Sequence, residues 1–171
     1  MDGHTLVLLR HAKAEPGDHR PDIERPLAER GRRDAAAAGA WLAAEGLRPD
    51  LVLCSPAVRT RQTWHGVAVA MAEADPAGGA PEVRYEAGLY DGGRTEVVDL
   101  LRAVPETVGT VLVIGHNPTV SDVSVLLRPD GRRTGGDVLP TSGLAVHRPA
   151  GPWSETQPGS AGLIRQHTAR G

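Results

Sequence analysis

The stretch TVLVIGHNP, residues 110–118, decides the fold class, because a strand-like run passes through a polar turn into the start of a helix. Its first six residues are nearly all apolar, which is typical of a strand buried on both faces of a parallel sheet. Asn117 is a preferred N-cap residue and Pro118 suits the first helical position. The stretch therefore predicts one strand–helix unit of an α/β protein.

The order of a strand followed by a helix occurs three times upstream, and two further strands follow downstream. TLVLLR (5–10) predicts a buried strand, followed by a loop at 12–26 and a helix from about 28 to 45 that Gly46 ends. The further predicted strands are 50–54, 82–85, 143–148 and 162–168, and the further predicted helices are 56–73, 95–104 and 118–127. This order predicts a three-layer α/β/α domain with a mostly parallel central sheet and a late edge hairpin, and we expect residues 1–171 to form a single domain.

Composition excludes several classes of partner. The net charge is −2 and only 3% of residues are aromatic, so the chain lacks both the basic field and the stacking surface of a nucleic-acid-binding protein. No apolar run reaches the roughly 18 residues of a membrane span. A lone cysteine, Cys54, suits a reducing compartment. We therefore expect a cytoplasmic protein that binds neither nucleic acid nor membrane.

Polar residues suited to a phosphoryl group follow three of the predicted strands. They are Arg10 and His11, Ser55 with Arg59, and His116 with Asn117. In open α/β sheets, ligands bind beyond the carboxyl ends of the strands, so these side chains are expected in one crevice. Arginines would clamp phosphate oxygens, one imidazole would act as nucleophile, and the second, if protonated, would add a donor. Ser55 and Asn117, each followed by proline, would start helices whose free N–H groups attract anions.

Four linked motifs resemble the histidine phosphatase superfamily, and more narrowly its short SixA-type branch of phosphohistidine phosphatases. They are Leu9-Arg10-His11-Ala12, Arg25-Pro26-Leu27 with Gly31, Ser55-Pro56 leading to Arg59 and Gln62-Thr63, and Val113 to Pro118. The resemblance implies a phosphoglycerate mutase-like fold and a covalent phosphohistidine intermediate on His11. It places Arg10, Arg59 and His116 in the phosphate pocket, and it implies no metal and no organic cofactor.

The chain departs from the family's larger phosphatases where they carry a proton-donating aspartate, because Asn117 stands there. Mutase-like members instead use a glutamate after the third strand, and Glu86 is the best-placed candidate, ahead of Asp91. Phosphohistidine expels an imidazole of unperturbed pKa roughly 6.5, which needs less protonation than an alkoxide. A site without a strong proton donor therefore favours a phosphohistidine protein as substrate. A small phosphorylated metabolite is the alternative.

Of three other interpretations, the sequence sets aside a cysteine-dependent phosphatase and a metal site, and leaves open a non-catalytic phosphate-binding domain. Cys54 precedes Arg59 by a spacing close to that of the cysteine-dependent phosphate loop, but one residue too short and without its glycines, so we interpret Cys54 as a small buried residue. The histidines lack the spacings of a metal site. A non-catalytic phosphate-binding domain would need the arginines but no nucleophile, and the presence of His11 favours an enzyme.

Overall fold

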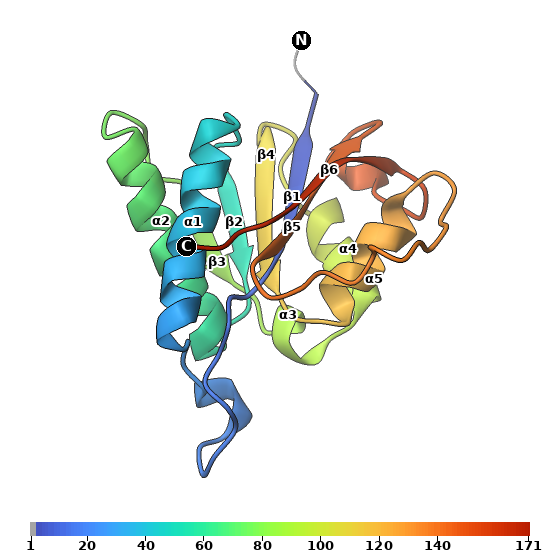
Figure 1. Cartoon of the computed structure of the whole chain (residues 1–171). Coiled ribbons are helices and arrows are strands. Elements are labelled where there is room, and N and C mark those ends of the chain that lie inside the picture. The colour runs from blue at the N-terminus through green and yellow to red at the C-terminus, as the bar shows by residue number, and fades with distance from the viewer. Residues whose placement is uncertain (1–2) are drawn as a thin grey trace.

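A computed structural model describes residues 3–171, and the strands within them form one mixed sheet in the order β3-β2-β4-β1-β5-β6 (Figure 1). The strands are β1 (Thr5–Arg10), β2 (Leu51–Cys54), β3 (Glu82–Tyr85), β4 (Thr110–Gly115), β5 (Gly143–Pro149) and β6 (Ala161–Thr168). Strands β1 to β4 pair in parallel, whereas β5 is antiparallel to both β1 and β6. The mostly parallel sheet and the late hairpin are as predicted, and β6 of the hairpin is one of the two edge strands.

Helices cover both faces of this sheet. They are α1 (Glu29–Ala44), α2 (Val58–Ala74), α3 (Gly88–Asp91), α4 (Arg94–Arg102) and α5 (Thr119–Leu127), with short 3-10 turns η1 (Asp22–Glu24) and η2 (Trp153–Glu155). In Figure 1, α1 and α2 lie on one side of the sheet and α3, α4 and α5 on the other. The three-layer α/β/α prediction is therefore confirmed.

The continuous apolar runs arise because both faces of the central strands are buried. Along β1, Val7 and Leu9 pack with the layer of α1 and α2, whereas Leu6 and Leu8 pack with the layer of α4 and α5. Successive side chains of a strand point to opposite faces, so a strand between two helical layers must be apolar at every position. Burial of these layers fixes β1, and with it the residues that follow β1.

The sequence-based helix starts need correction. Helix α2 begins at Val58 with Ala57 as its N-cap, and α5 begins at Thr119, so Ser55 and Asn117 cap neither helix. Their side chains take other partners, described below. The short helix α3 was not predicted, because four residues are too few to show a helical period. Gly46 ends α1 as expected, with the left-handed φ of 69° that glycine tolerates.

Within residues 3–171, no helix has both the length and the apolar content that crossing a bilayer requires.

Candidate active site

The three segments predicted to carry site residues meet at the carboxyl ends of the parallel strands. Strands β2, β4 and β1 are neighbours and run parallel, so their carboxyl ends lie side by side. The backbone N–H of His11 donates to the Gly115 carbonyl (3.0 Å), and that of Ser55 donates to the Ile114 carbonyl (3.0 Å). The residues after β1, β2 and β4 are thus held in register by the sheet's own hydrogen bonds.

His11 and His116 lie next to each other at this edge. Their ring centroids are 5.2 Å apart, and the ring planes are inclined by 57°. His11 is 8% exposed, so its ring sits in a nearly closed site. The two histidines that the sequence placed in one crevice are therefore neighbours in the fold.

The protonation of His11 follows from its hydrogen bond. Nδ1 lies 2.7 Å from the carbonyl oxygen of Ala12, and because a carbonyl can only accept, Nδ1 carries the proton. Burial lowers the pKa of His11 to about 3, and the charges of His116, Arg59 and Arg10 add to this effect. The imidazole is neutral near pH 7, with a free electron pair on Nε2.

His116 is oriented by Ser55. Its Nε2 lies 2.8 Å from Ser55 Oγ, which also accepts a hydrogen bond from the backbone N–H of Ala57 (3.3 Å). If the serine proton goes to Nε2, Nδ1 of His116 carries the ring hydrogen. Burial, aided by Arg59, lowers the pKa of His116 to about 4. Near pH 7 the ring is therefore neutral, and in this tautomer it offers Nδ1–H as a donor without the protonation on which the sequence-based role of a second histidine was conditional.

Arg59 and Arg10 are held by their outer nitrogens. Arg59 Nη1 donates to the Asp22 carbonyl (2.8 Å) and Nη2 donates to Asp22 Oδ2 (3.0 Å). Arg10 Nη1 donates to the carbonyl of Leu139 (3.1 Å). The two contacts of Arg59 fix the plane of its guanidinium, and both arginines keep an unused Nε–H.

Three buried donors at this site have no partner within residues 3–171: Nε of Arg10, Nε of Arg59 and, in the tautomer inferred above, Nδ1–H of His116. We call them the orphan-donor cluster. A buried N–H without an acceptor costs about 1–3 kcal/mol, so such groups are rare in native proteins unless a ligand satisfies them. All three residues lie near enough for their charges to affect the pKa of His11. The arrangement is suited to an anion bearing several oxygens, beside an imidazole with a free electron pair.

Asp22 and Tyr90 belong to the site and were not predicted. The Tyr90 hydroxyl donates to Asp22 Oδ2 (2.8 Å), and its ring meets His116 edge-on with centroids 5.6 Å apart. The hydrogen bond from Tyr90, with those from Arg25 and Arg59, holds the pKa of Asp22 well below its usual range. The Asp22–Arg59 contact spans 37 residues, and nothing in the local sequence pattern indicates that pairing.

Asn117 and Glu86 both lie at the carboxyl ends of the parallel strands, but their hydrogen-bond partners differ. The Asn117 amide donates to the Leu139 carbonyl (2.7 Å), and its oxygen accepts from Ser121 Oγ (2.6 Å). Glu86 directly follows β3, where its backbone N–H donates to the Cys54 carbonyl (2.9 Å), and it is half-buried. The predicted roles of Asn117 in binding phosphate and of Glu86 as acid stay predictions.

Cys54 has the buried position that the sequence indicated. It is fully buried, and burial raises the pKa of its thiol to about 12, so it carries no thiolate near neutral pH. In the part of the chain that the structure describes, no group of three His, Cys, Asp or Glu side chains is placed to hold a metal ion.

The chain is similar in sequence and structure to proteins of one family. Residues 6–87 match the model of the histidine phosphatase superfamily (branch 1). An uncharacterized protein of Mycobacterium tuberculosis is 38% identical over 168 residues, which cover 95% of this chain and 100% of the relative.

Two solved structures are similar over nearly the whole chain. The structure described as "putative phosphohistidine phosphatase SixA" from Nakamurella multipartitia has a TM-score of 0.83 and 33% identity, over 99% of this chain and 98% of that one. A structure of the protein histidine phosphatase SixA, 24% identical, shares the fold with a TM-score of 0.77 over 96% of both chains. The chain therefore belongs to the histidine phosphatase superfamily, with SixA proteins among its structural neighbours.

Proposed function

We propose that this phosphatase removes phosphate from phosphohistidine in proteins, through a covalent phosphohistidine intermediate on His11. The observation that carries the proposal is the hydrogen bond from His11 Nδ1 to Ala12, because it leaves Nε2 unprotonated beside the orphan-donor cluster. A neutral imidazole is a competent nucleophile toward phosphorus near pH 7.

The reaction has two steps. In the first, the electron pair of His11 Nε2 forms a bond to phosphorus as the bond to the leaving nitrogen breaks, and that nitrogen takes up a proton from solvent. In the second, water attacks the phosphoryl group and gives up one proton to solvent as the P–Nε2 bond breaks, which returns the electron pair to His11 and releases phosphate. The N–H groups of the orphan-donor cluster stabilise the charge on the equatorial oxygens in both transition states.

The leaving group supports phosphohistidine as substrate. An imidazole of pKa roughly 6.5 departs with little help, whereas an alkoxide must be protonated as it leaves. Asn117 stands where larger relatives carry a proton-donating aspartate, and within residues 3–171 the carboxylate of Glu86 makes no hydrogen bond or ion pair that would orient it as a strong acid.

A small-molecule phosphomonoesterase is the second candidate. Its support is the position of Glu86 directly after β3, at the sheet edge that carries His11 and His116. A carboxyl group at this edge is within the region from which a general acid would have to act.

Turnover tests the proposal. A phosphohistidine peptide and a panel of sugar phosphates and other phosphate monoesters would be compared by phosphate release, for the native protein, for His11→Ala, and for His65→Ala, an exposed histidine on α2, as the matched control. We expect the peptide to give the highest kcat/KM, His11→Ala to be inactive, and His65→Ala to behave as native. Preference for a monoester would favour the second candidate, and phosphate binding without turnover on any substrate would indicate a non-catalytic domain.

A further inference from the structure

Two side chains of the candidate active site share one acceptor, the backbone carbonyl of Leu139. Arg10 Nη1 donates to this oxygen (3.1 Å), and so does the Asn117 amide (2.7 Å). Within residues 3–171 this is the one hydrogen bond that the Arg10 guanidinium makes. Leu139 lies in the segment that joins α5 to β5, residues 128–142, which we call the α5–β5 loop. The direction of Arg10 therefore depends on where this loop places a single carbonyl group.

Ser121 and Asn117 hold Leu139 from the side of α5. The Ser121 hydroxyl accepts from the backbone N–H of Leu139 (2.9 Å) and donates to Asn117 Oδ1 (2.6 Å). Because the Asn117 amide nitrogen donates to the Leu139 carbonyl, the three residues close a ring of three hydrogen bonds, which we call the hydrogen-bond ring. Ser121 and Leu139 are 4% and 2% exposed. Water therefore competes little for these bonds, which strengthens them relative to bonds at the surface.

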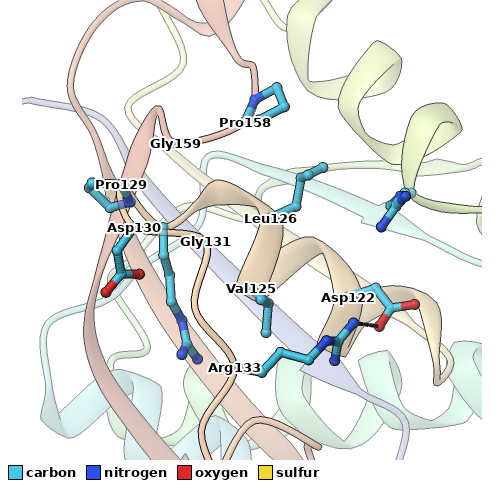
Figure 2. Close-up of a pocket in the computed structure, with 11 residues that line it drawn as sticks. Asp122, Val125, Leu126, Pro129, Asp130, Gly131, Arg133, Pro158 and Gly159 are labelled. Atoms are coloured by element: carbon cyan, nitrogen blue, oxygen red, sulfur yellow. Dashed lines mark hydrogen bonds and ion pairs between the residues drawn. The ribbon is translucent and has the colours of Figure 1, made fainter.

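Ion pairs hold the rest of the α5–β5 loop. Arg128, directly after α5, pairs with Asp137 across the loop (2.7 Å), and both side chains are buried. Arg133 pairs with Asp122 of α5 (2.8 Å), the contact drawn as a dashed line in Figure 2, which also shows Pro129 to Gly131 leaving the end of the helix. The loop is thus tied to α5 at points other than Leu139, and this limits how far the Leu139 carbonyl can move.

Asn117 is the residue type that the hydrogen-bond ring requires. A carbonyl can only accept, so the amide nitrogen must face Leu139 and Oδ1 must face the Ser121 hydroxyl. An ionised aspartate in this place would bring a carboxylate oxygen against the Leu139 carbonyl, with no hydrogen between the two oxygens. The asparagine at the place where larger relatives carry an acid thus has a structural reason of its own.

We propose that Asn117 and Ser121 are positioning residues, which act on the reaction through the Leu139 carbonyl and Arg10. A guanidinium stabilises the charge of the transition state only in the direction in which it is held, so a displaced carbonyl would leave Arg10 present but misdirected. This role for Asn117 differs from the direct phosphate contact that the sequence predicted. The inference rests on the proposed function for the role of Arg10 at the phosphoryl group, whereas the hydrogen-bond ring itself does not depend on the substrate.

Ser121→Ala tests the hydrogen-bond ring without altering Arg10 or Asn117. The substitution removes the acceptor of the Leu139 N–H, so the ¹H–¹⁵N resonance of Arg10 Nε should shift in the ligand-free protein. Its assignment follows from its absence in Arg10→Lys. With an aryl phosphate, kcat should fall roughly three- to tenfold while KM changes less, because a misdirected arginine loses more contact with the transition state than with bound substrate.

Ser124→Ala is the matched control. Ser124 is a second buried serine of α5, and its hydroxyl pairs with His147 rather than with Leu139. The substitution should lower stability, but it should leave the Arg10 resonance and kcat as in the native protein. An Arg10 resonance that Ser121→Ala leaves unchanged, or that Ser124→Ala shifts equally, would overturn the proposal.

Asn117→Ala, alone and combined with Ser121→Ala, separates positioning from direct binding of phosphate. If both residues act through Leu139, kcat of the double variant should be at most about twofold below that of the worse single variant. Losses that multiply would indicate that Asn117 contacts phosphate itself, and would contradict the positioning role. If Ser121→Ala fails to fold, the ligand-free Arg10 resonance in Asn117→Ala decides, and the absence of a shift there would overturn the proposal.

The two readouts keep this inference apart from the proposed function. The Arg10 resonance is recorded without substrate and needs no turnover. A native protein that hydrolyses no phosphorylated substrate would contradict the proposed function, while the shift in Ser121→Ala would still test the hydrogen-bond ring.

Discussion

At the scale of single residues, Asp22 connects the loop after β1 to the candidate active site. Its carboxylate and carbonyl hold the outer edge of Arg59, and Tyr90 and Arg25 hold the carboxylate in turn. Arg59 is thereby oriented with Nε unpaired and its plane fixed. Asp22 is a positioning residue in this account, because it acts through Arg59.

Asp22→Asn should lower kcat about tenfold and change KM less. The reason is that Arg59, no longer held by a carboxylate, would be less well oriented to stabilise the negative charge of the transition state. Steady-state kinetics with an aryl phosphate would measure both constants. Asp18→Asn is the matched control, because Asp18 lies in the same loop but pairs with Arg20 at the surface. Equal effects of the two substitutions would show that the loop, rather than the Asp22–Arg59 contact, matters.

Glu86→Gln should separate the two candidate substrates. If Glu86 protonates a leaving alkoxide, the substitution should slow phosphate-ester hydrolysis on the order of 10²-fold and phosphohistidine cleavage much less. Parallel kcat/KM values for one ester and one phosphohistidine peptide would give the ratio. Equal loss on both substrates would assign Glu86 to positioning, and no loss on either would assign it to the surface.

At the scale of elements, α2 stabilises the segment that carries His11, the proposed nucleophile. The Thr63 hydroxyl accepts from the backbone N–H of Ala12 (3.0 Å), and Gln62 Oε1 accepts from that of Leu27 (2.7 Å). The first turns of α2 thus hold the loop after β1 at both ends, while Arg59 faces the active site from the same helix. This gives a structural reason for the Gln62-Thr63 pair that follows Arg59 in the motif.

Gly31 shows how closely α1 packs against that segment. A Cβ added at Gly31 would lie 2.0 Å from the backbone oxygen of Lys13, two residues after His11. Because the obstructing atom is backbone, Gly31→Ala should destabilise the protein by about 2–3 kcal/mol and lower activity, as measured by urea unfolding and phosphate release. Gly162→Ala in β6, where nothing lies within 4 Å of the added Cβ, should change stability by less than about 0.5 kcal/mol. A Gly31→Ala variant as stable as the native protein would contradict this packing.

The elements show what sequence could and could not predict. β1 and β4 have the predicted bounds, because continuous apolar runs between turn residues leave little freedom, and the mostly exposed edge strand β3 has its predicted bounds as well. The convergence of His11 and His116 was predictable from the rule that parallel strands end at one edge. The predicted N-caps were wrong, because neither side chain caps a helix. The Ser55 hydroxyl hydrogen-bonds to His116, and the Asn117 amide donates to the Leu139 carbonyl. The roles of Asp22 and Tyr90 were not predictable, because their side chains contact residues that are far apart from them in the sequence.

At the scale of the whole molecule, buried histidines make stability depend on pH. Burial lowers the pKa of His11 to about 3, and lowers the pKa of both His116 and His147 to about 4. The unfolded chain, with histidine pKa values near 6.5, binds more protons below that pH, so the free energy of unfolding should fall as the pH drops from 7 to 5.5. Above about pH 7 this contribution is fully present.

Urea unfolding at pH 7, 6.5, 6 and 5.5 would measure the slope. Each buried histidine contributes up to about 1.4 kcal/mol per pH unit in this window. His147 lies outside the active site, with its ring nitrogens near Ser124 and Ala161, so His147→Gln should reduce the slope by up to that amount. A free energy of unfolding that stays constant from pH 7 to 5.5 would contradict the assignment of neutral buried histidines.

Metal removal tests the whole charge arrangement of the active site. Arginines, rather than a cation, neutralise the phosphoryl group in this account, so turnover should be unchanged after exhaustive chelation with EDTA and buffer exchange. Loss of activity that one divalent metal restores would require a different mechanism.

The proposed function depends above all on the phosphorylation of His11. Rapid acid-free quenching during turnover of a ³²P-labelled substrate, followed by peptide mapping, would locate the trapped phosphate. We predict label on His11 in an acid-labile, base-stable form, and no label in His11→Ala, while His65→Ala is labelled like the native protein. Label on Ser55 or another residue, or turnover by the His11→Ala variant, would contradict the account.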